Sequence, residues 1–231
     1  MLKRFVSLLM PRAVIILICG LLLMSTISYF RTGKTVAGEL SLDGKALRFA
    51  SRYLNEDSIV ISKSKHLIYY CKNGFIVRNV SWDGFNISFP APIAIGMGGR
   101  YETPTGEYYI CQKNPDSRYT LFLGLSWPNI AVANRAIELG NRLSNYDYKR
   151  IVAANLSKTT PPWDTPLGGT YGIHGAATYL KYAVDRMERK DPNLIFVTKT
   201  DNTRGCVAVE HRVLRFLYAN VDEGTPVLII N

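Results

Sequence analysis

The sequence of 231 residues is long enough for one domain with a sizeable core and too short for two large ones. Hydrophobic residues make up 47% and charged residues 20%, which excludes a disordered chain. The net charge of +10 favours an anionic partner, such as nucleic acid, a membrane surface or an acidic wall polymer. No basic run alternates with aromatic residues in the pattern of a nucleic-acid groove, so nucleic-acid binding is not expected.

A basic segment at the N-terminus precedes a long apolar stretch. Residues 1–12 carry Lys3, Arg4 and Arg12, and residues 13–30 are uncharged. These eighteen residues reach the lower limit for a membrane-spanning helix, and no small-residue cleavage pattern follows directly. We therefore expect an uncleaved signal anchor, with a cleaved signal as the alternative. The basic residues before the span place the rest of the chain in the periplasm or cell exterior, either anchored to the membrane or secreted.

The next segment, residues 31–57, reads as a linker with one short helix. Ala46, Phe49, Ala50 and Tyr53 recur at helical spacing in a helix expected over 44–55. Two leucines, Leu47 and Leu54, are expected to widen its apolar face.

From residue 58 to 231 the pattern predicts one domain of short strands. Strands are expected at 59–61, 67–71, 75–80, 90–96, 107–111, 207–209 and 227–230. A hairpin turn is expected at Asn73-Gly74, and helices at 179–189 and 211–220. This is a mainly β fold with a few helices, either a sandwich or a barrel, preceded by the N-terminal anchor helix.

The cysteines carry little structural information. Four cysteines are too few for a disulfide scaffold. Cys71 and Cys111 both lie in strand-like segments, where they either pair in an oxidising compartment or remain buried free thiols.

The most informative residues are a cysteine and a histidine flanked by glycines. Cys206 ends the segment Thr-Arg-Gly-Cys, and His174 lies within Gly-Ile-His-Gly. A thiol attacks as thiolate, so a cysteine nucleophile needs a base close by, and it needs amide donors for the oxyanion. Gly205 and Gly175 give the backbone room, and the Gly205 and Cys206 amides are candidate oxyanion donors. The residues alone leave a second interpretation open, that of a buried thiol and a core histidine.

Further segments accompany this pair in a fixed order along the chain. They are residues 60–70 followed by Asn73-Gly74, Thr103-Pro104-Thr105-Gly106, Trp127-Pro128-Asn129, Pro161-Pro162-Trp163, Thr165-Pro166-Leu167-Gly168-Gly169 and Gly224-Thr225-Pro226-Val227. Together with the two central motifs, they resemble the YkuD-type L,D-transpeptidase catalytic domain over about three quarters of the chain.

The resemblance implies a cysteine acyltransferase that acts on peptidoglycan stem peptides without a cofactor. Cys206 would attack the carbonyl of the third residue, a diamino acid, with His174 as base, and the terminal D-alanine would leave. An amine or water would then resolve the acyl-enzyme, giving a cross-link, a protein attachment or hydrolysis. Thr203 occupies the Ser/Thr position of the family motif and is expected to orient the loop.

The sequence departs from the family motif in three places. Arg204 replaces the usual histidine, where it would favour the thiolate, bind a substrate carboxylate or have no catalytic role. Ala208 stands where many members carry an arginine or asparagine. The segment between His174 and Cys206 is also long, and its basic helix would be either a lid or a solvated surface.

Two other functions are compatible with the sequence. One is a catalytically silent module that binds anionic wall polymer through its positive charge, and the other is a sortase-like transpeptidase. The residues before Cys206 do not resemble the sortase pattern. The sequence also lacks a cluster of ligands that would predict a metal and a glycine loop that would predict a nucleotide.

Overall fold

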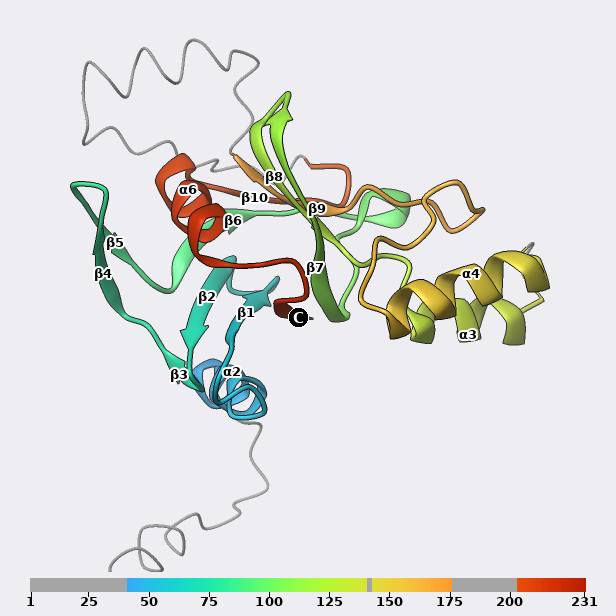
Figure 1. Cartoon of the computed structure of the whole chain (residues 1–231), viewed down its shortest axis with the longest axis horizontal. Coiled ribbons are helices and arrows are strands. Elements are labelled where there is room, and N and C mark those ends of the chain that lie inside the picture. Colours follow the sequence, from blue (N-terminus) through green and yellow to red (C-terminus); the bar gives the residue numbers. More distant parts are fainter. Residues whose placement is uncertain (1–40, 141–142, 176–202) are drawn as a thin grey trace, which may run out of the picture. The chain divides into compact units, whose positions relative to one another are not determined.

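The computed structural model describes residues 41–140, 143–175 and 203–231 (Figure 1). The expected segments 1–12 and 13–30, residues 31–40 of the expected linker 31–57 and the expected helix at 179–189 lie outside the described residues. Among the described residues, no helix is both long and apolar enough to cross a membrane. The described residues between 41 and 231 form one compact unit.

The centre of this unit is a closed ring of strands, as expected for a mainly β domain of the barrel type. In order around the ring the strands are β1 (Asp57–Ser62), β11 (Pro226–Ile230), β7 (Gly106–Ser117), β8 (Thr120–Leu125), β9 (Gly172–Gly175), β10 (Val207–Val209), β6 (Ala91–Ala94) and β2 (Leu67–Lys72). An antiparallel pairing of β2 with β1 closes the ring. Closure leaves no unpaired sheet edge between these strands.

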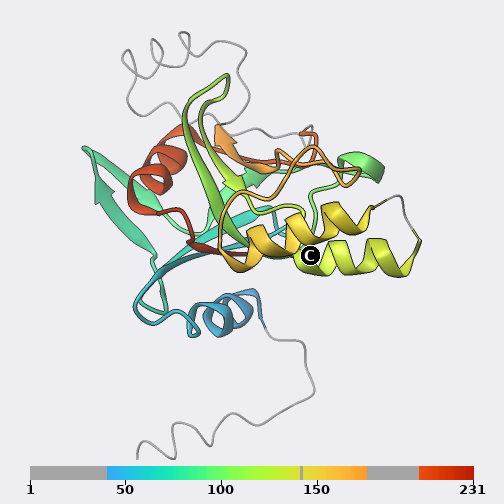
Figure 2. The ribbon, with the colours of Figure 1, turned by 45° about the vertical axis from the view of Figure 1, so that its right-hand side comes forward.

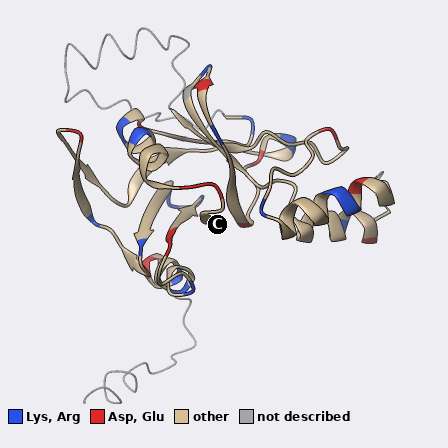
Figure 3. Cartoon of the chain, viewed as in Figure 1, with Lys and Arg blue, Asp and Glu red and all other residues tan. Residues whose placement is uncertain are grey.

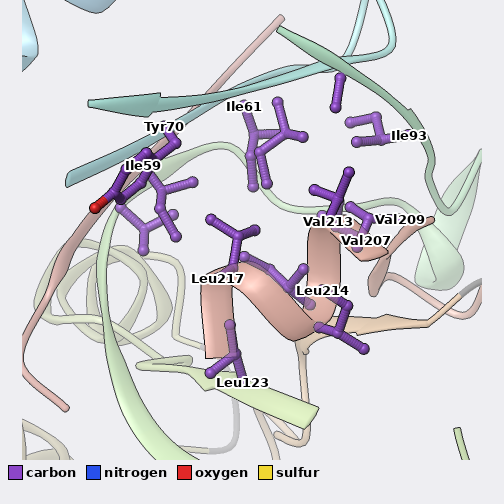
Figure 4. Packing of buried hydrophobic residues seen from close by; sticks show 14 of the residues in the cluster. Ile59, Ile61, Tyr70, Ile93, Leu123, Val207, Val209, Val213, Leu214 and Leu217 are labelled. Atoms are coloured by element: carbon purple, nitrogen blue, oxygen red, sulfur yellow. The ribbon is translucent and has the colours of Figure 1, made fainter. Parts of the chain in front are cut away.

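Helix α6 (His211–Asn220) contributes the apolar face that fills the ring. Its buried side chains, including Leu214 and Leu217, pack with residues of β1, β8 and β10 in one cluster (Figure 4). Each of these two leucines is fully buried, which contributes roughly 1.5–3 kcal/mol per side chain. The sequence prediction of a helix over 211–220 is confirmed.

Helix α2 (Leu42–Ala50) packs on the outside of the ring against β1 and β2. The Ser41 hydroxyl accepts a hydrogen bond from the Gly44 N–H at 3.1 Å and starts the helix before the expected range. The expected extension to residue 55 was wrong, because the helix ends at Ala50. Leu47 and Leu54 are exposed and do not join the buried face.

Two helices between β8 and β9 were not predicted from the sequence. Helices α3 (Ile130–Glu138) and α4 (Asn145–Leu156) lie side by side (Figures 1 and 2). Side chains cap both helices, since Asn129 accepts from the Val132 N–H and Ser144 from the Asp147 N–H. Their small shared core consists of Ala133, Ala136, Leu143 and Ile151.

Several strand boundaries also differ from expectation. The single strand expected over 75–80 is two elements, β3 (Phe75–Ile76) and β4 (Asn79–Trp82), and β4 forms a separate hairpin with β5 (Phe85–Ser88). Both hairpin turns have two residues with positive φ, Asn73-Gly74 and Asp83-Gly84. The strand expected at 107–111 is the first part of the longer β7, and strands β8 and β9 had not been predicted. A short 3₁₀ turn (Gly99–Tyr101) ends the glycine-rich segment after β6.

Candidate active site

The ring brings the predicted nucleophile and base to neighbouring parallel strands. His174 lies on β9 opposite Ala208 of β10, and Cys206 lies two residues before Ala208. With about 3.3 Å rise per residue and about 4.8 Å between strands, the Cα atoms of Cys206 and His174 are about 8 Å apart. Cys206 directly precedes β10 (Val207–Val209), and if its backbone continues the extended strand, we expect its thiol on the same side as Ala208 and His174.

The hydrogen bond of His174 determines its tautomer. Its Nδ1 lies 2.7 Å from the carbonyl oxygen of Gly175, which can only accept, so Nδ1 carries the hydrogen in the neutral ring. The remaining lone pair is therefore on Nε2. Burial lowers the pKa of the imidazole below its ordinary value of 6.5, although the bond to Gly175 raises it. Electrostatic interactions with Arg118 and His211 lower this pKa further, which favours the neutral imidazole near pH 7.

The Cys206 thiol is also neutral in the resting site. Its Sγ donates to the Thr170 carbonyl oxygen at 3.6 Å. Burial raises the pKa of this thiol, whereas the Gly172 N–H and the positive charge of Arg118 lower it. A neutral thiol and a neutral imidazole are the resting states that general-base activation of a cysteine requires.

Two threonine hydroxyls hold the backbone of the nucleophile. The Thr203 hydroxyl donates to the Cys206 carbonyl at 2.6 Å, and Thr203 is the residue that was expected to orient the loop. The Thr103 hydroxyl donates to the same carbonyl at 3.3 Å and accepts from the Gly96 N–H at 2.9 Å. Sequence reasoning had not assigned Thr103 to the site, although it is the first residue of the Thr-Pro-Thr-Gly segment.

The glycines of the site are required by close contacts. Gly205 has φ of +100°, and a Cβ there would lie 2.0 Å from Cε1 of Tyr171. Within the described part of the chain, no acceptor contacts the Gly205 N–H, which suits its predicted role as an oxyanion donor. A Cβ at Gly175 would lie 2.4 Å from Cε1 of His211, so the predicted steric role of Gly175 has a defined neighbour.

Two tyrosine rings, Tyr101 and Tyr119, contact residues of this site. Arg204 is exposed, and its guanidinium lies 5.7 Å from the ring centre of Tyr101. Tyr119, at the turn between β7 and β8, stacks on the His174 ring at 4.3 Å with an interplanar angle of 18°. Neither a motif nor a periodic pattern in the sequence indicated that Tyr119 or its neighbour Arg118 belongs to the site. Their position near His174 depends on the pairing of β8 with β9.

The other described cysteines are separate from this chemistry. Cys71 and Cys111 are free and buried, and burial raises the pKa of each thiol to about 11. Thiols with such a pKa are unreactive near neutral pH. Among the described residues, no three His, Cys, Asp or Glu side chains are grouped as metal ligands.

The fold is a β-barrel-like domain in which Cys206 and His174 lie near each other on neighbouring segments of the ring. The profile of the L,D-transpeptidase catalytic domain (YkuD) matches residues 56–229. The chain therefore belongs to the L,D-transpeptidase catalytic domain family. No curated protein matches the chain.

Solved structures of low sequence identity include L,D-transpeptidases from three bacteria. An enzyme from Mycobacterium smegmatis is 13% identical with a TM-score of 0.40, and the match covers 76% of this chain and 59% of that one. An enzyme from Mycobacterium tuberculosis H37Rv is 15% identical with a TM-score of 0.39, and the match covers 76% of this chain and 57% of that one. The C442S mutant of the Enterococcus faecium enzyme is 14% identical with a TM-score of 0.38, and the match covers 77% of this chain and 50% of that one. The chain spans less than two thirds of the length of these three proteins.

Proposed function

We propose that this protein is a cysteine acyl-transfer enzyme that acts on peptidoglycan stem peptides, with Cys206 as nucleophile and His174 as base. The observation that carries the proposal is that His174 on β9 pairs with Ala208 of β10, two residues after Cys206, while its Nδ1 lies 2.7 Å from the Gly175 carbonyl oxygen. Membership of the L,D-transpeptidase family supports the substrate class.

In the first half-reaction, Nε2 of His174 takes the thiol proton while Sγ attacks the carbonyl carbon of the third stem residue. The carbonyl π electrons move to oxygen, and the Gly205 and Cys206 amides donate to the resulting oxyanion. The oxyanion then collapses and the C–N bond to the terminal D-alanine breaks. The imidazolium gives its proton to the leaving amine, and a thioester remains on Cys206.

In the second half-reaction, an amine or water attacks the thioester carbon. His174 accepts a proton from the attacking group and returns it to the departing sulfur, so the free thiol is restored. An amine acceptor gives a cross-link or a protein attachment, and water gives hydrolysis. Either outcome uses the same pair of residues.

Arg204 is the third residue that we assign to this function. Its exposed side chain follows Thr203 and precedes Gly205 in the loop that positions the nucleophile. A guanidinium there provides bidentate donors for a carboxylate on the stem peptide. We expect Arg204→Gln to raise KM for a stem peptide more than it lowers kcat.

We also propose that the domain acts outside the cytoplasm, anchored by residues 13–30. The support is the basic segment before an apolar stretch of membrane-spanning length. Membrane fractionation with protease protection tests this proposal. Recovery of a shortened chain in the soluble fraction would instead support a cleaved signal.

The central test is incubation of the purified protein with a defined tetrapeptide muropeptide, with and without an acceptor amine, followed by mass spectrometry. The expected result is loss of the terminal D-alanine and formation of either a cross-linked or a hydrolysed product. Cys206→Ala is expected to abolish both this reaction and labelling at residue 206 by a thiol probe. Full turnover by Cys206→Ala would refute the mechanism. Salt-sensitive wall binding without turnover in the unmodified protein would support the silent binding module.

A further inference from the structure

The turn between β7 and β8 places an arginine close to the predicted catalytic pair. The Tyr119 ring stacks on the His174 imidazole, and the Arg118 guanidinium lies 4.7 Å from the centre of the same tyrosine ring. Nη2 of Arg118 also donates to the Tyr119 hydroxyl at 2.6 Å. Arg118, Tyr119 and His174 therefore form a continuous series of contacts that extends from the base toward solvent.

The charge of Arg118 acts on both groups of the pair. It lowers the pKa of the His174 imidazole and that of the Cys206 thiol. Arg118 is exposed, and among the described residues it makes no ion pair with a carboxylate. Figure 3 shows that basic and acidic residues both occur on the β7–β8 hairpin. None of the ion pairs among the described residues includes Arg118. An accessible cation of this kind beside a nucleophile is suited to an anionic part of the substrate.

We propose that Arg118, together with the Tyr119 hydroxyl, binds the terminal carboxylate of the donor stem peptide. This inference rests on the proposed function and assigns the residue that recognises the end of that substrate.

The geometry of proton transfer identifies which carboxylate is bound. His174 must lie within about 3 Å of the leaving amine nitrogen to protonate it. In the terminal residue only one Cα separates this nitrogen from the carboxylate carbon, so the two atoms are about 2.5 Å apart. The terminal carboxylate must then lie beside the imidazole, where Tyr119 stacks and Arg118 reaches.

The donor groups match a carboxylate in number and direction. A guanidinium has five N–H donors, of which the Tyr119 hydroxyl uses one in this structure. The hydroxyl hydrogen of Tyr119 is then directed away from Arg118 and can be donated to the same carboxylate. Such charge-assisted bonds favour a donor that ends in a free carboxylate at the residue released.

The test compares two donors that differ only at the terminus: a tetrapeptide acid and the corresponding tetrapeptide amide. Release of the terminal residue by the purified full chain is measured for both as kcat/KM. We expect the unmodified protein to prefer the acid by about tenfold to hundredfold, as hydrogen bonds to charged groups typically provide. Arg118→Gln is expected to lower kcat/KM for the acid much more than kcat/KM for the amide, because only the acid loses a bound carboxylate, and so to bring the ratio close to one. Arg118→Lys is expected to retain part of the preference.

Arg100 provides a matched control. Its guanidinium lies 4.8 Å from the ring centre of Tyr101 and its Nη2 donates to the Tyr101 hydroxyl at 2.7 Å, so the local geometry is the same. We expect Arg100→Gln to keep the acid-to-amide ratio of the unmodified protein. An unchanged ratio in Arg118→Gln would overturn the inference, as would an equal loss of preference in Arg100→Gln.

Binding separates this inference from the proposed function. Dissociation constants of the acid and the amide are measured by calorimetry with Cys206→Ala and with the double variant that also carries Arg118→Gln. Tighter binding of the acid that depends on Arg118, with no turnover by the unmodified protein, would support the inference and contradict the proposed reaction. Turnover accompanied by equal binding of acid and amide would refute the inference alone. If neither turnover nor binding occurred, both would be refuted.

Discussion

Replacement of Thr103 by valine tests how the nucleophile loop is held. Valine keeps the shape of the side chain and removes only the hydroxyl. Thr103 is fully buried, and its hydroxyl joins the Cys206 carbonyl to the Gly96 N–H. The substitution therefore removes two hydrogen bonds at once and leaves the buried Gly96 amide without this acceptor.

The expected loss of stability follows from those two effects. The bond to the Cys206 carbonyl contributes about 1 kcal/mol, and a buried amide without a partner costs about 1–3 kcal/mol. Thr103→Val should thus lower the free energy of unfolding by about 2–4 kcal/mol. Thr203→Val should lower it by only about 1 kcal/mol, because the Cys206 carbonyl keeps its bond to Thr103 and no other group loses a partner.

Urea unfolding followed by tryptophan fluorescence measures both values. Thr105→Val is the matched control, since Thr105 is exposed in the same loop and its stability should stay within about 0.5 kcal/mol of the unmodified protein. We also expect turnover by Thr103→Val to fall about tenfold to hundredfold, because the carbonyl that fixes Cys206 loses one of its two donors. Equal stabilities for Thr103→Val and Thr203→Val would refute this account of the loop.

Three further predictions concern the rest of the site and the core. Gly205→Ala forces a Cβ into the Tyr171 ring at φ of +100°, so stem-peptide turnover should be lost while circular dichroism still shows a folded β protein. Because burial raises the pKa of the Cys206 thiol, its alkylation rate should keep rising above pH 8, and a plateau between pH 6 and 8 would indicate a thiolate–imidazolium pair instead. The lowered pKa of His174 contributes stability that is present above about pH 6.5 and is lost as the pH falls, so His174→Gln should flatten the acid side of the stability curve measured by thermal unfolding.

Local sequence patterns predicted the elements with several buried apolar residues and the hairpin turn with an Asn-Gly signal. Runs of apolar and aromatic residues located β1 and β2, and the Asn73-Gly74 signal located the turn that follows β2. Helix α6 had the correct bounds because its apolar residues recur at helical spacing. Helix α4 was missed because it buries only Ile151 and its helical periodicity is weak, whereas α3 has a clear amphipathic pattern that was not recognised.

The site was predictable to the extent that it follows motifs. Cys206, His174, Gly205, Gly175 and Thr203 were all named from the sequence, and the structure places them around two adjacent strands.

The remaining site residues depend on strand pairing across the ring. Thr103 reaches Cys206 from 103 residues away, and Tyr119 reaches His174 because β8 pairs with β9. A single sequence contains no signal for such distant contacts. Arg204 could be singled out from the sequence because it replaces a histidine of the family motif. Arg118 could be proposed as a substrate-binding residue only from the structure, which places it beside Tyr119 and near His174.

The position of β11 in the ring has a consequence for how the enzyme is made. Residues 226–230 pair with β1 on one side, where Ile59 is opposite Val227, and with β7 on the other. A partner so distant along the sequence makes ring closure slow compared with formation of local hairpins. Until the last strand is inserted, β1 and β7 present unpaired edges that can bind other chains. The ring therefore closes only after residues 226–230 have been synthesised, and the strands that hold Cys206 and His174 acquire their closed scaffold at that stage.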